Sequence, residues 1–262
     1  MFTRFLGSQS ASPEGKLKFA DVPAAELADR FGTPLYVLSG PDMRAAIREF
    51  VAADPEARIS YASKANGALS VLRIARDEGI DVDVASEGEL EGGIRAGFEP
   101  RQITLHGSNK SDSELKRAAE LGVAAVVLDH ISEIERLGAF AKKTVNVMIR
   151  LAPGVDPETH EAISTGQADT KFGFGILDGS ANQALKSVLD HPNLNLTGLH
   201  VHVGSQLMNS DAHTDAIKKM ADFAISRDLD LEELCVGGGI GIRYTASEKP
   251  ESFAEHCGRI KR

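Results

Sequence analysis

Short apolar runs recur along the chain, and segments with helical spacing separate them. The runs centre on Tyr61, Val82, Leu105, Val127, Val147, Val201 and Leu234. The first four intervals are each about 20 residues, which is the length of one strand followed by one helix. Between these runs, apolar residues recur every three or four positions, as on an amphipathic helix, over 69–78, 87–96, 111–121 and 132–142. The pattern therefore predicts repeated strand–helix units.

Alternating strand–helix units predict an α/β protein with a parallel sheet, and this many of them favour a (β/α)8 barrel of the TIM type. A doubly wound sheet is the alternative, but its glycine-rich turn follows the first strand. Here the glycine-rich run Gly237-Gly-Gly-Ile-Gly241 follows the last strand. We count seven strands, so we expect the eighth to be missing and the sheet to have an open edge.

Other segments lie outside this repeat. Residues 1–20 are polar and rich in glycine and serine, which favours a loose arm. Residues 33–39 have the pattern of a strand, and 41–53 that of a helix capped by Ser39. Residues 152–195 form a long excursion of the kind that shapes a barrel mouth. We expect two parts: residues 1–38, an arm and strand that join a β-domain, and residues 39–262, a cofactor-binding barrel domain.

Composition narrows the class of protein. The 262 residues are 42% hydrophobic and 26% charged, as in ordinary globular proteins. A net charge of -9 argues against nucleic acid as a partner, and no apolar run is long enough to span a membrane. The first residues lack the apolar stretch of a secretion signal, and Cys235 and Cys257 have no metal-ligand spacing. We expect a cytoplasmic protein with reduced thiols, no metal site and no membrane partner.

Charged and polar residues mark the carboxyl ends of five predicted strands. Aliphatic residues alternate with them, and the outer face of a barrel strand should be aliphatic because it meets helices. The other face leads to the mouth, where five side chains should converge: Lys64, Asp83, His106, Arg150 and His202. Taken singly, Asp83 reads as a helix cap, Arg150 as a surface ion pair and His202 as a core histidine. Five such residues at equivalent strand ends predict a site.

These residue types fit a pyridoxal phosphate site. A lysine in a restricted space can form a Schiff base with an aldehyde cofactor, and Lys64 has that position. A flat imidazole such as His202 can stack on the cofactor ring. Backbone N–H groups of the run at 237–241 can bind the phosphate, because barrels commonly hold phosphate after the seventh strand. Ser205 can add a hydroxyl donor. A carboxylate is also needed at the pyridine nitrogen, so that the ring acts as an electron sink.

Five segments in collinear order resemble diaminopimelate decarboxylase, a pyridoxal-phosphate enzyme of the alanine racemase/ornithine decarboxylase fold group. They are Tyr61-Ala-Ser-Lys-Ala-Asn66, Asp83-Val-Ala-Ser-Glu-Gly-Glu89, His106-Gly-Ser-Asn-Lys-Ser111, Gly198-Leu-His-Val-His-Val-Gly-Ser-Gln206 and Gly237-Gly-Gly-Ile-Gly241. The resemblance covers roughly residues 25–262. It implies an alanine racemase-like barrel in which Lys64 forms the Schiff base and His202 stacks on the ring.

The same resemblance implies the other site residues. Ser205, Gly237, Gly238 and Gly239 would hold the phosphate, and Asp83 and Arg150 match residues that line the cofactor pocket. The segments Ile163-Ser-Thr-Gly166 and Lys171-Phe-Gly173 resemble a part of the family near the substrate. The implied reaction is the decarboxylation of meso-2,6-diaminopimelate to L-lysine and carbon dioxide, in lysine biosynthesis. The implied assembly is a homodimer of the full-length form.

The sequence also departs from the family. The family's β-domain carries a Glu-Pro-Gly-Arg segment, whose Glu contacts the pyridine nitrogen, a Cys-Glu-Ser segment and a late tyrosine, and none of them is present. Asp83 does not match that glutamate. We therefore expect a barrel that is incomplete at its C-terminal end, without the eighth strand and the β-domain. We expect little decarboxylase activity from the chain alone.

Three alternatives stay open. A barrel-only pyridoxal-phosphate-binding protein without catalysis has a similar length, although residues 152–195 and 106–111 favour a decarboxylase. A metal-dependent barrel hydrolase would use His200 and His202 as ligands, but its histidine pair belongs on the first strand, which carries Lys64. A decarboxylase of ornithine, arginine or carboxynorspermidine differs only in its substrate, and the resemblance alone decides between these substrates.

Overall fold

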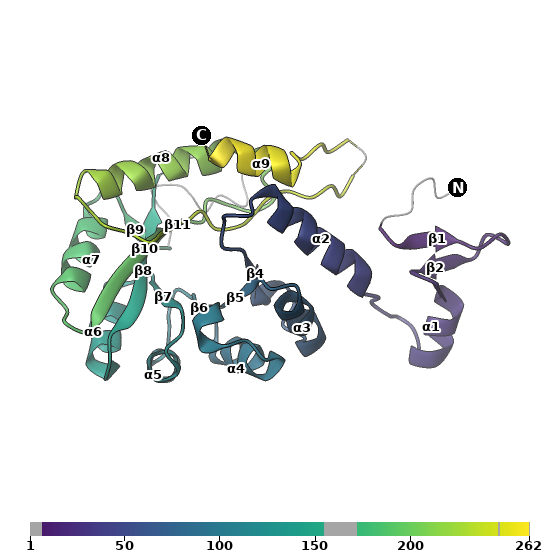
Figure 1. Ribbon diagram of the computed structural model, residues 1–262, viewed down its shortest axis with the longest axis horizontal. Helices are drawn as coiled ribbons and strands as arrows, with labels where there is room; N and C mark the ends of the chain where they lie inside the picture. Colours follow the sequence, from purple (N-terminus) through teal and green to yellow (C-terminus); the bar gives the residue numbers. More distant parts are fainter. Residues whose placement is uncertain (1–6, 155–171, 246, 262) are drawn as a thin grey trace.

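The computed structural model describes residues 7–154, 172–245 and 247–261, and its main feature is a curled parallel sheet (Figure 1). Neighbouring strands follow the order β11-β10-β8-β7-β6-β5-β4, and every pair on this path is parallel. The strands are β4 (Ser60–Ala62), β5 (Asp81–Val84), β6 (Ile103–Leu105), β7 (Ala125–Leu128), β8 (Val145–Ala152), β10 (Leu194–His200) and β11 (Glu233–Cys235). The seven predicted strands and the α/β barrel class are confirmed. A short β9 (Phe174–Gly175) pairs with the end of β8.

Helices alternate with these strands and cover the outer face of the curl (Figure 1). They are α2 (Gly40–Ala53), α3 (Leu69–Asp77), α4 (Glu87–Ala96), α5 (Asp112–Leu121), α6 (Ile131–Phe140), α7 (Ser180–Leu189), α8 (Asp211–Ile225) and α9 (Phe253–Ile260). Their ends follow local chemistry. Ser111 and Glu114 form a capping box at the start of α5, and Gly122 ends it in the left-handed conformation.

The two faces of the sheet differ as the alternation predicts. Val82, Val84 and Val147 are fully buried in the main apolar cluster, between strands and helices. A smaller cluster of Ala125, Val127 and Met148, with Cys235 beside it, consists of strand residues only. Full burial of each large aliphatic side chain contributes about 1.5–3 kcal/mol. The strand face with the larger aliphatic side chains therefore packs against the helices. The opposite face, which carries Asp81 and Asp83 on β5, points to the interior of the curl.

The two edge strands of the sheet, β4 and β11, are not paired with each other among the described residues. The curl nevertheless brings them near each other. Arg58, just before β4, has its Nε 2.5 Å from Asp81 Oδ2 on β5 and its Nη1 3.6 Å from Glu233 Oε1 on β11. The predicted open edge is therefore present in this part of the chain, with an arginine between its two sides.

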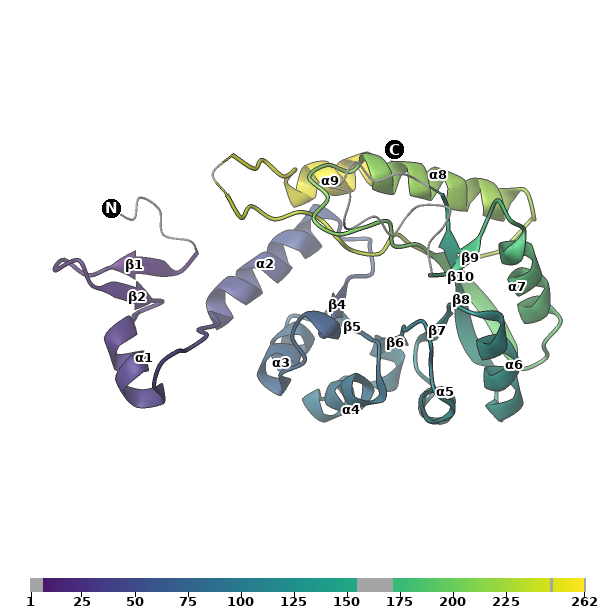
Figure 2. The same ribbon diagram turned by 180° about the vertical axis from the view of Figure 1, so that it is seen from behind.

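The N-terminal residues form a separate small sheet beyond α2 (Figure 2). It contains β1 (Gln9–Ala11), β2 (Leu17–Phe19) and β3 (Val22–Pro23), followed by α1 (Ala24–Phe31). The expectation of a loose arm over residues 1–20 is wrong for the hairpin at 9–19. A turn with Gly15 at a positive φ closes that hairpin, and its N–H donates to Ser12 O. Polar composition did not reveal this pairing.

The strand predicted over residues 33–39 is not formed in the described structure. The backbone of 35–39 belongs to no ladder, and the Tyr36 side chain is fully exposed. Alternating apolar residues indicate an extended backbone, but a strand also requires a neighbour for its hydrogen bonds. No described segment supplies one. In the same described ranges, no helix is both long and apolar enough to cross a membrane.

Candidate active site

The five residues expected at the strand ends lie on the predicted strands or within two residues after them. Lys64 lies in a single helical turn (Ser63–Ala65) after β4, and Asp83 lies on β5. His106 follows β6, Arg150 lies on β8, and His202 follows β10 by two residues. The apolar run centred on Val201 extends past the strand, because β10 spans Leu194–His200. All five side chains therefore belong to the same end of the sheet.

Short contacts and electrostatic interactions link the residues expected at the strand ends. His106 Nε2 lies 3.5 Å from Asp83 Oδ2, and the His106 and His200 rings meet edge to face with centroids 5.0 Å apart. Burial, followed by the charge of Lys64 and then of Arg150, lowers the pKa of His202 to about 4. Both cations thus act on the same imidazole. His202 is neutral at pH 7 and carries no charge that would have to be desolvated beneath an aromatic ring.

The buried Ser63 and the half-buried Glu89 hold the turn that carries Lys64. The Ser63 hydroxyl donates to the Asp83 carbonyl at 2.8 Å and to Glu89 Oε2 at 2.5 Å. Glu89 Oε2 also accepts the Ala85 N–H at 2.9 Å. Ser63 is buried and Lys64 is exposed. The residue before the lysine is therefore anchored to β5 and α4, which leaves the Lys64 amine free to project from the strand end.

Arg150 has a partner that sequence reasoning missed. Its Nη1 donates to Asp129 Oδ2 at 2.8 Å, and Asp129 is buried directly after β7. The other oxygen of Asp129 accepts the Gly173 N–H at 2.6 Å. The Arg150 guanidinium also lies 4.7 Å from the centroid of the Phe172 ring. Asp129 therefore ties Arg150 to the returning end of the excursion. The predicted near-substrate residues 163–166 and Lys171 lie outside the described residues.

A buried ion pair next to Asp129 was also missed. Lys110 Nζ donates to Glu133 Oε2 at 2.9 Å and to the carbonyls of Gly107 and Val127 at 2.7 and 2.5 Å. Glu133 Oε2 also accepts the Asp129 N–H at 3.0 Å. Burial lowers the pKa of Lys110, whereas the Glu133 charge raises it. Each of the three N–H groups of the Lys110 ammonium has an acceptor. Lys110 therefore supports the loop after β6, and its amine is not available at the barrel mouth.

The glycine run packs closely against the segment that follows β10. Gly237 and Gly239 have φ values of +71° and +98°, which favour glycine. A Cβ on Gly237 would lie 2.5 Å from the Val201 carbonyl, and one on Gly239 would collide with the Gly204 carbonyl. The same Gly239 Cβ would lie 3.3 Å from Ser205 Cα. The run and Ser205 are thus neighbours, and the bare backbone between them fits a phosphate group bound through N–H donors.

Replacing Gly239 with alanine is expected to disrupt the conformation of the glycine run, because the new Cβ has no space and the φ is unfavourable. Gly238→Ala is the matched control, since a Cβ there meets nothing within 4 Å and its φ is not positive. Cofactor retention after gel filtration, read by absorbance, checks both variants. Equal losses in the two variants would contradict the predicted packing.

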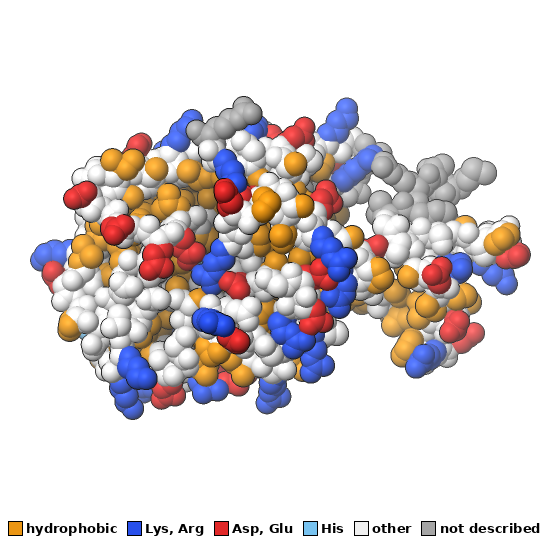
Figure 3. All heavy atoms as spheres, in the orientation of Figure 1, with side chains coloured by type: hydrophobic (Ala, Val, Ile, Leu, Met, Phe, Trp, Pro, Cys, Tyr) orange, Lys and Arg blue, Asp and Glu red, His pale blue; other side chains and the backbone are white. Residues whose placement is uncertain are grey.

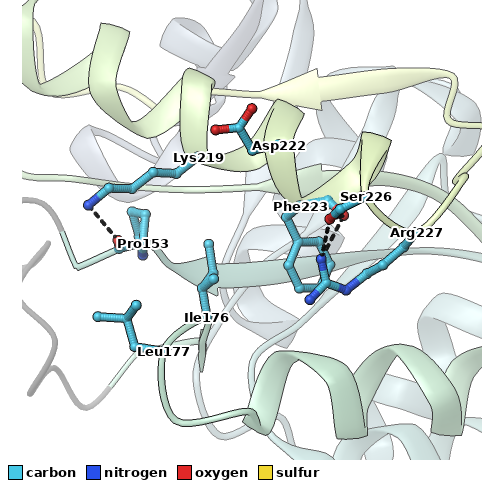
Figure 4. A pocket seen from close by; sticks show the side chains of 8 residues that line it. All are labelled: Pro153, Ile176, Leu177, Lys219, Asp222, Phe223, Ser226 and Arg227. Atoms are coloured by element: carbon cyan, nitrogen blue, oxygen red, sulfur yellow. Dashed lines mark hydrogen bonds between the residues drawn. The ribbon is translucent and has the colours of Figure 1, made fainter.

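A pocket of about 250 Å³ lies elsewhere, between α8 and the segments after β8 and β9 (Figure 4). Lys219 crosses it, and its Nζ donates to the carbonyls of Pro153 and Gly154 at 3.0 Å each. The lining residues are Pro153, Ile176, Leu177, Lys219, Asp222, Phe223, Ser226 and Arg227. None of the residues expected at the strand ends lines it, so the candidate site is the barrel mouth.

Comparison with known proteins identifies the family of the chain. Residues 41–262 match the family model described as pyridoxal-dependent decarboxylase, pyridoxal binding domain. Diaminopimelate decarboxylase of Actinosynnema pretiosum subsp. auranticum is 42% identical over 247 residues, which are 94% of this chain and 56% of that protein. The Bacillus subtilis (strain 168) enzyme of that name is 36% identical over 265 residues, which are 97% of this chain and 60% of that protein.

Solved structures show the same relationship. Diaminopimelate decarboxylase from M. jannaschii superposes with a TM-score of 0.90 at 30% identity, covering 97% of this chain and 62% of that one. Its complex with L-lysine superposes with a TM-score of 0.89. The chain thus spans less than two thirds of the length of these relatives. The resemblance seen in the five motifs is confirmed, and the chain belongs to the family of pyridoxal-dependent decarboxylases, whose pyridoxal-binding domain matches residues 41–262.

Proposed function

We propose that this chain carries the cofactor-binding barrel of an enzyme that decarboxylates meso-2,6-diaminopimelate to L-lysine and carbon dioxide. The observation that carries the proposal is the gathering of Lys64, His202 and the glycine run at one end of a family-matched barrel. The relatives quoted above, named diaminopimelate decarboxylase, support the choice of reaction. When bound, pyridoxal phosphate supplies an electron sink for the bond that loses carbon dioxide.

Each residue has a role that follows from its position. Lys64 would hold the cofactor covalently through its amine, which Ser63 directs away from the strand. His202, neutral at pH 7, would lie against the cofactor ring. Ser205 and the N–H groups of residues 237–239 would bind the phosphate. These contacts would fix the cofactor at both ends, so that its ring has one orientation in the mouth.

Asp83 and Arg150 would border the pocket. The Asp83 carboxylate faces His106 at 3.5 Å, and Arg150 is held by Asp129 at 2.8 Å. An arginine fixed by a buried carboxylate presents its remaining N–H donors in one direction, which suits a carboxylate-bearing substrate. The Glu of the family's β-domain, which is absent from this sequence, has no replacement among these residues.

His202, and not His200, is expected to touch the ring. His200 is almost completely buried and packs edge to face on His106, whereas His202 is partly exposed beyond the strand end. His202→Ala should therefore lower the affinity for pyridoxal phosphate by about two- to tenfold, the loss of a stacking contact of about 0.5–1.5 kcal/mol. Equilibrium dialysis measures it. His200→Ala should instead lower the melting temperature, and the reverse ranking would contradict the assignment.

The domain division, assembly and location are part of the same proposal. Exposed apolar side chains gather on and after the N-terminal unit (Figure 3). They include Phe31, Leu35, Tyr36 and Leu38. We infer that residues 1–38 pack against a β-domain and that residues 39–262 form the barrel domain. The homodimer of the full-length form and the cytoplasmic location are proposed from the resemblance to the family. Light scattering tests the assembly.

Carbon dioxide and lysine release from meso-diaminopimelate tests the reaction. The assay compares the chain alone with the chain extended by the family's β-domain, both loaded with pyridoxal phosphate. We expect lysine from the extended form and little from the chain alone. Ornithine and arginine serve as alternative substrates. Faster carbon dioxide release from either one would identify the chain as part of an ornithine or arginine decarboxylase instead. Cofactor retention without product from any of them would favour a pyridoxal-phosphate-binding protein without catalysis.

A further inference from the structure

A histidine from α8 contacts the backbone of the glycine run. His213 Nε2 lies 3.1 Å from the Gly238 carbonyl oxygen. His213 is in the first turn of α8 and only 1% exposed. The motifs at the strand ends do not include it. A buried ring placed on the backbone of the predicted phosphate site therefore has no role so far.

The hydrogen position on this ring follows from its surroundings. Burial, followed by the charge of neighbouring His256, lowers the pKa of His213 to about 4, so the ring is neutral at pH 7 with one N–H. A carbonyl oxygen only accepts hydrogen bonds, so the hydrogen belongs on Nε2 and donates to Gly238. His213 Nδ1 is buried and has no partner among the described residues. One hydrogen bond therefore holds the Gly238 carbonyl toward α8.

The orientation of that carbonyl determines the direction of the next N–H. A trans peptide is planar, so the Gly238 C=O and the Gly239 N–H point in opposite directions. Within the described ranges, nothing accepts a hydrogen bond from the Gly239 N–H, although its carbonyl accepts from Leu207 at 2.9 Å. Without a Cβ on either side, the peptide between Gly238 and Gly239 is less restricted than it would be between other residues. A fixed carbonyl is then what keeps the Gly239 N–H pointing away from α8.

We propose that His213 is a positioning residue, which holds the Gly238 carbonyl so that the Gly239 N–H points at the phosphate of pyridoxal phosphate. This inference rests on the proposed function. It assigns to His213 no contact with the cofactor itself. Its effect should therefore appear only with ligands that carry the phosphate.

A neighbouring histidine provides the control. His256 on α9 packs edge to face on His213, with ring centroids 4.9 Å apart, and its Nδ1 lies 3.7 Å from Glu251 Oε2. It is as buried as His213. Among the described contacts it has none with the glycine run. Replacing it removes a buried imidazole from the same place without removing the hydrogen bond to Gly238.

The experiment measures the affinity of the full chain for pyridoxal phosphate and for pyridoxal, which lacks the phosphate, by absorbance titration. His213→Leu should weaken the binding of pyridoxal phosphate roughly tenfold or more, the size expected for one charge-assisted hydrogen bond, and leave pyridoxal unchanged. His213→Gln, whose amide nitrogen can replace Nε2, should restore most of the affinity. His256→Leu should lower the melting temperature and leave the ratio of the two affinities as in the wild type.

The outcomes separate the inference from the proposed function. If His213→Leu leaves the ratio of the two affinities unchanged, whether or not both affinities fall, the positioning role is overturned. The wild-type affinity would still support a cofactor site. If the wild-type chain binds neither ligand, the proposed function fails and this role fails with it. His213→Phe also lacks the donor and replaces the leucine variant in the comparison if that one does not fold.

Discussion

Lys64→Ala is expected to abolish covalent retention of pyridoxal phosphate. The Lys64 amine projects from the strand end, where Ser63 and Glu89 hold the preceding turn in place. Another lysine near this end, Lys110, is 3% exposed and donates to three acceptors, so it cannot replace Lys64. Borohydride reduction followed by peptide mass spectrometry measures the adduct, and we expect none in the variant.

Lys64→Arg separates charge from chemistry. It keeps a cation at the strand end, but a guanidinium stays protonated and does not act as the nucleophile. We expect it to lose the reduced adduct as completely as the alanine variant while keeping more noncovalent affinity for the cofactor. Lys186→Ala, which removes an exposed lysine of α7, should leave the adduct unchanged. A reduced adduct on another lysine of the folded wild-type chain would show that the assignment is wrong.

Glu133→Gln is expected to destabilise the fold by about 3–5 kcal/mol, the cost of leaving one member of a buried ion pair without its partner. Glu133 is 1% exposed, and its carboxylate accepts from Lys110 Nζ, Lys110 N–H and Asp129 N–H at 2.9 to 3.1 Å. The amide would place an N–H against these donors while the Lys110 charge stays buried. Urea unfolding followed by circular dichroism gives the change in the free energy of unfolding.

Replacing both partners should cost less than the sum of the single changes. In Lys110→Met combined with Glu133→Leu, no charge is left buried and unpaired, so part of the loss is recovered. Arg117→Ala, which breaks a half-exposed pair with Glu91, should cost about 1 kcal/mol or less. If Glu133→Gln costs no more than Arg117→Ala, or if the double variant is additive, the buried pair has less importance than its geometry indicates.

Residues that the sequence analysis did not identify as part of the site mostly have partners far away in the chain. Lys110 lies in a loop motif, where a lysine ordinarily reaches water, and its acceptors at Val127 and Glu133 come from later elements. No local pattern separates a buried charge from an exposed one. Asp129 was within reach of sequence reasoning, because it directly follows a run of four buried apolar residues and so ends a strand. His213 had no such signal, since its partner is a backbone carbonyl 25 residues away.

The end of β10 and the N-terminal hairpin are two features that local sequence patterns did not predict correctly. Alternation placed β10 in the correct strand–helix unit, but the strand ends at His200, and Val201 N–H still donates to Cys235. The apolar run continues past the strand because Val201 and Val203 are buried in the main apolar cluster as well. The hairpin at 9–19 has weak alternation, and only its cross-strand hydrogen bonds define it.

Local patterns along the chain predict the number and order of the barrel strands, the face that each strand buries and the residues that reach its carboxyl end. These features depend on periods of two and 3.6 residues, which involve neighbouring positions only. The partners of those residues depend instead on contacts between distant segments: Asp129 for Arg150, Glu133 for Lys110 and His213 for the Gly238 carbonyl. The curl of the sheet brings together positions far apart in the chain, and pairing energies depend on that proximity and on burial.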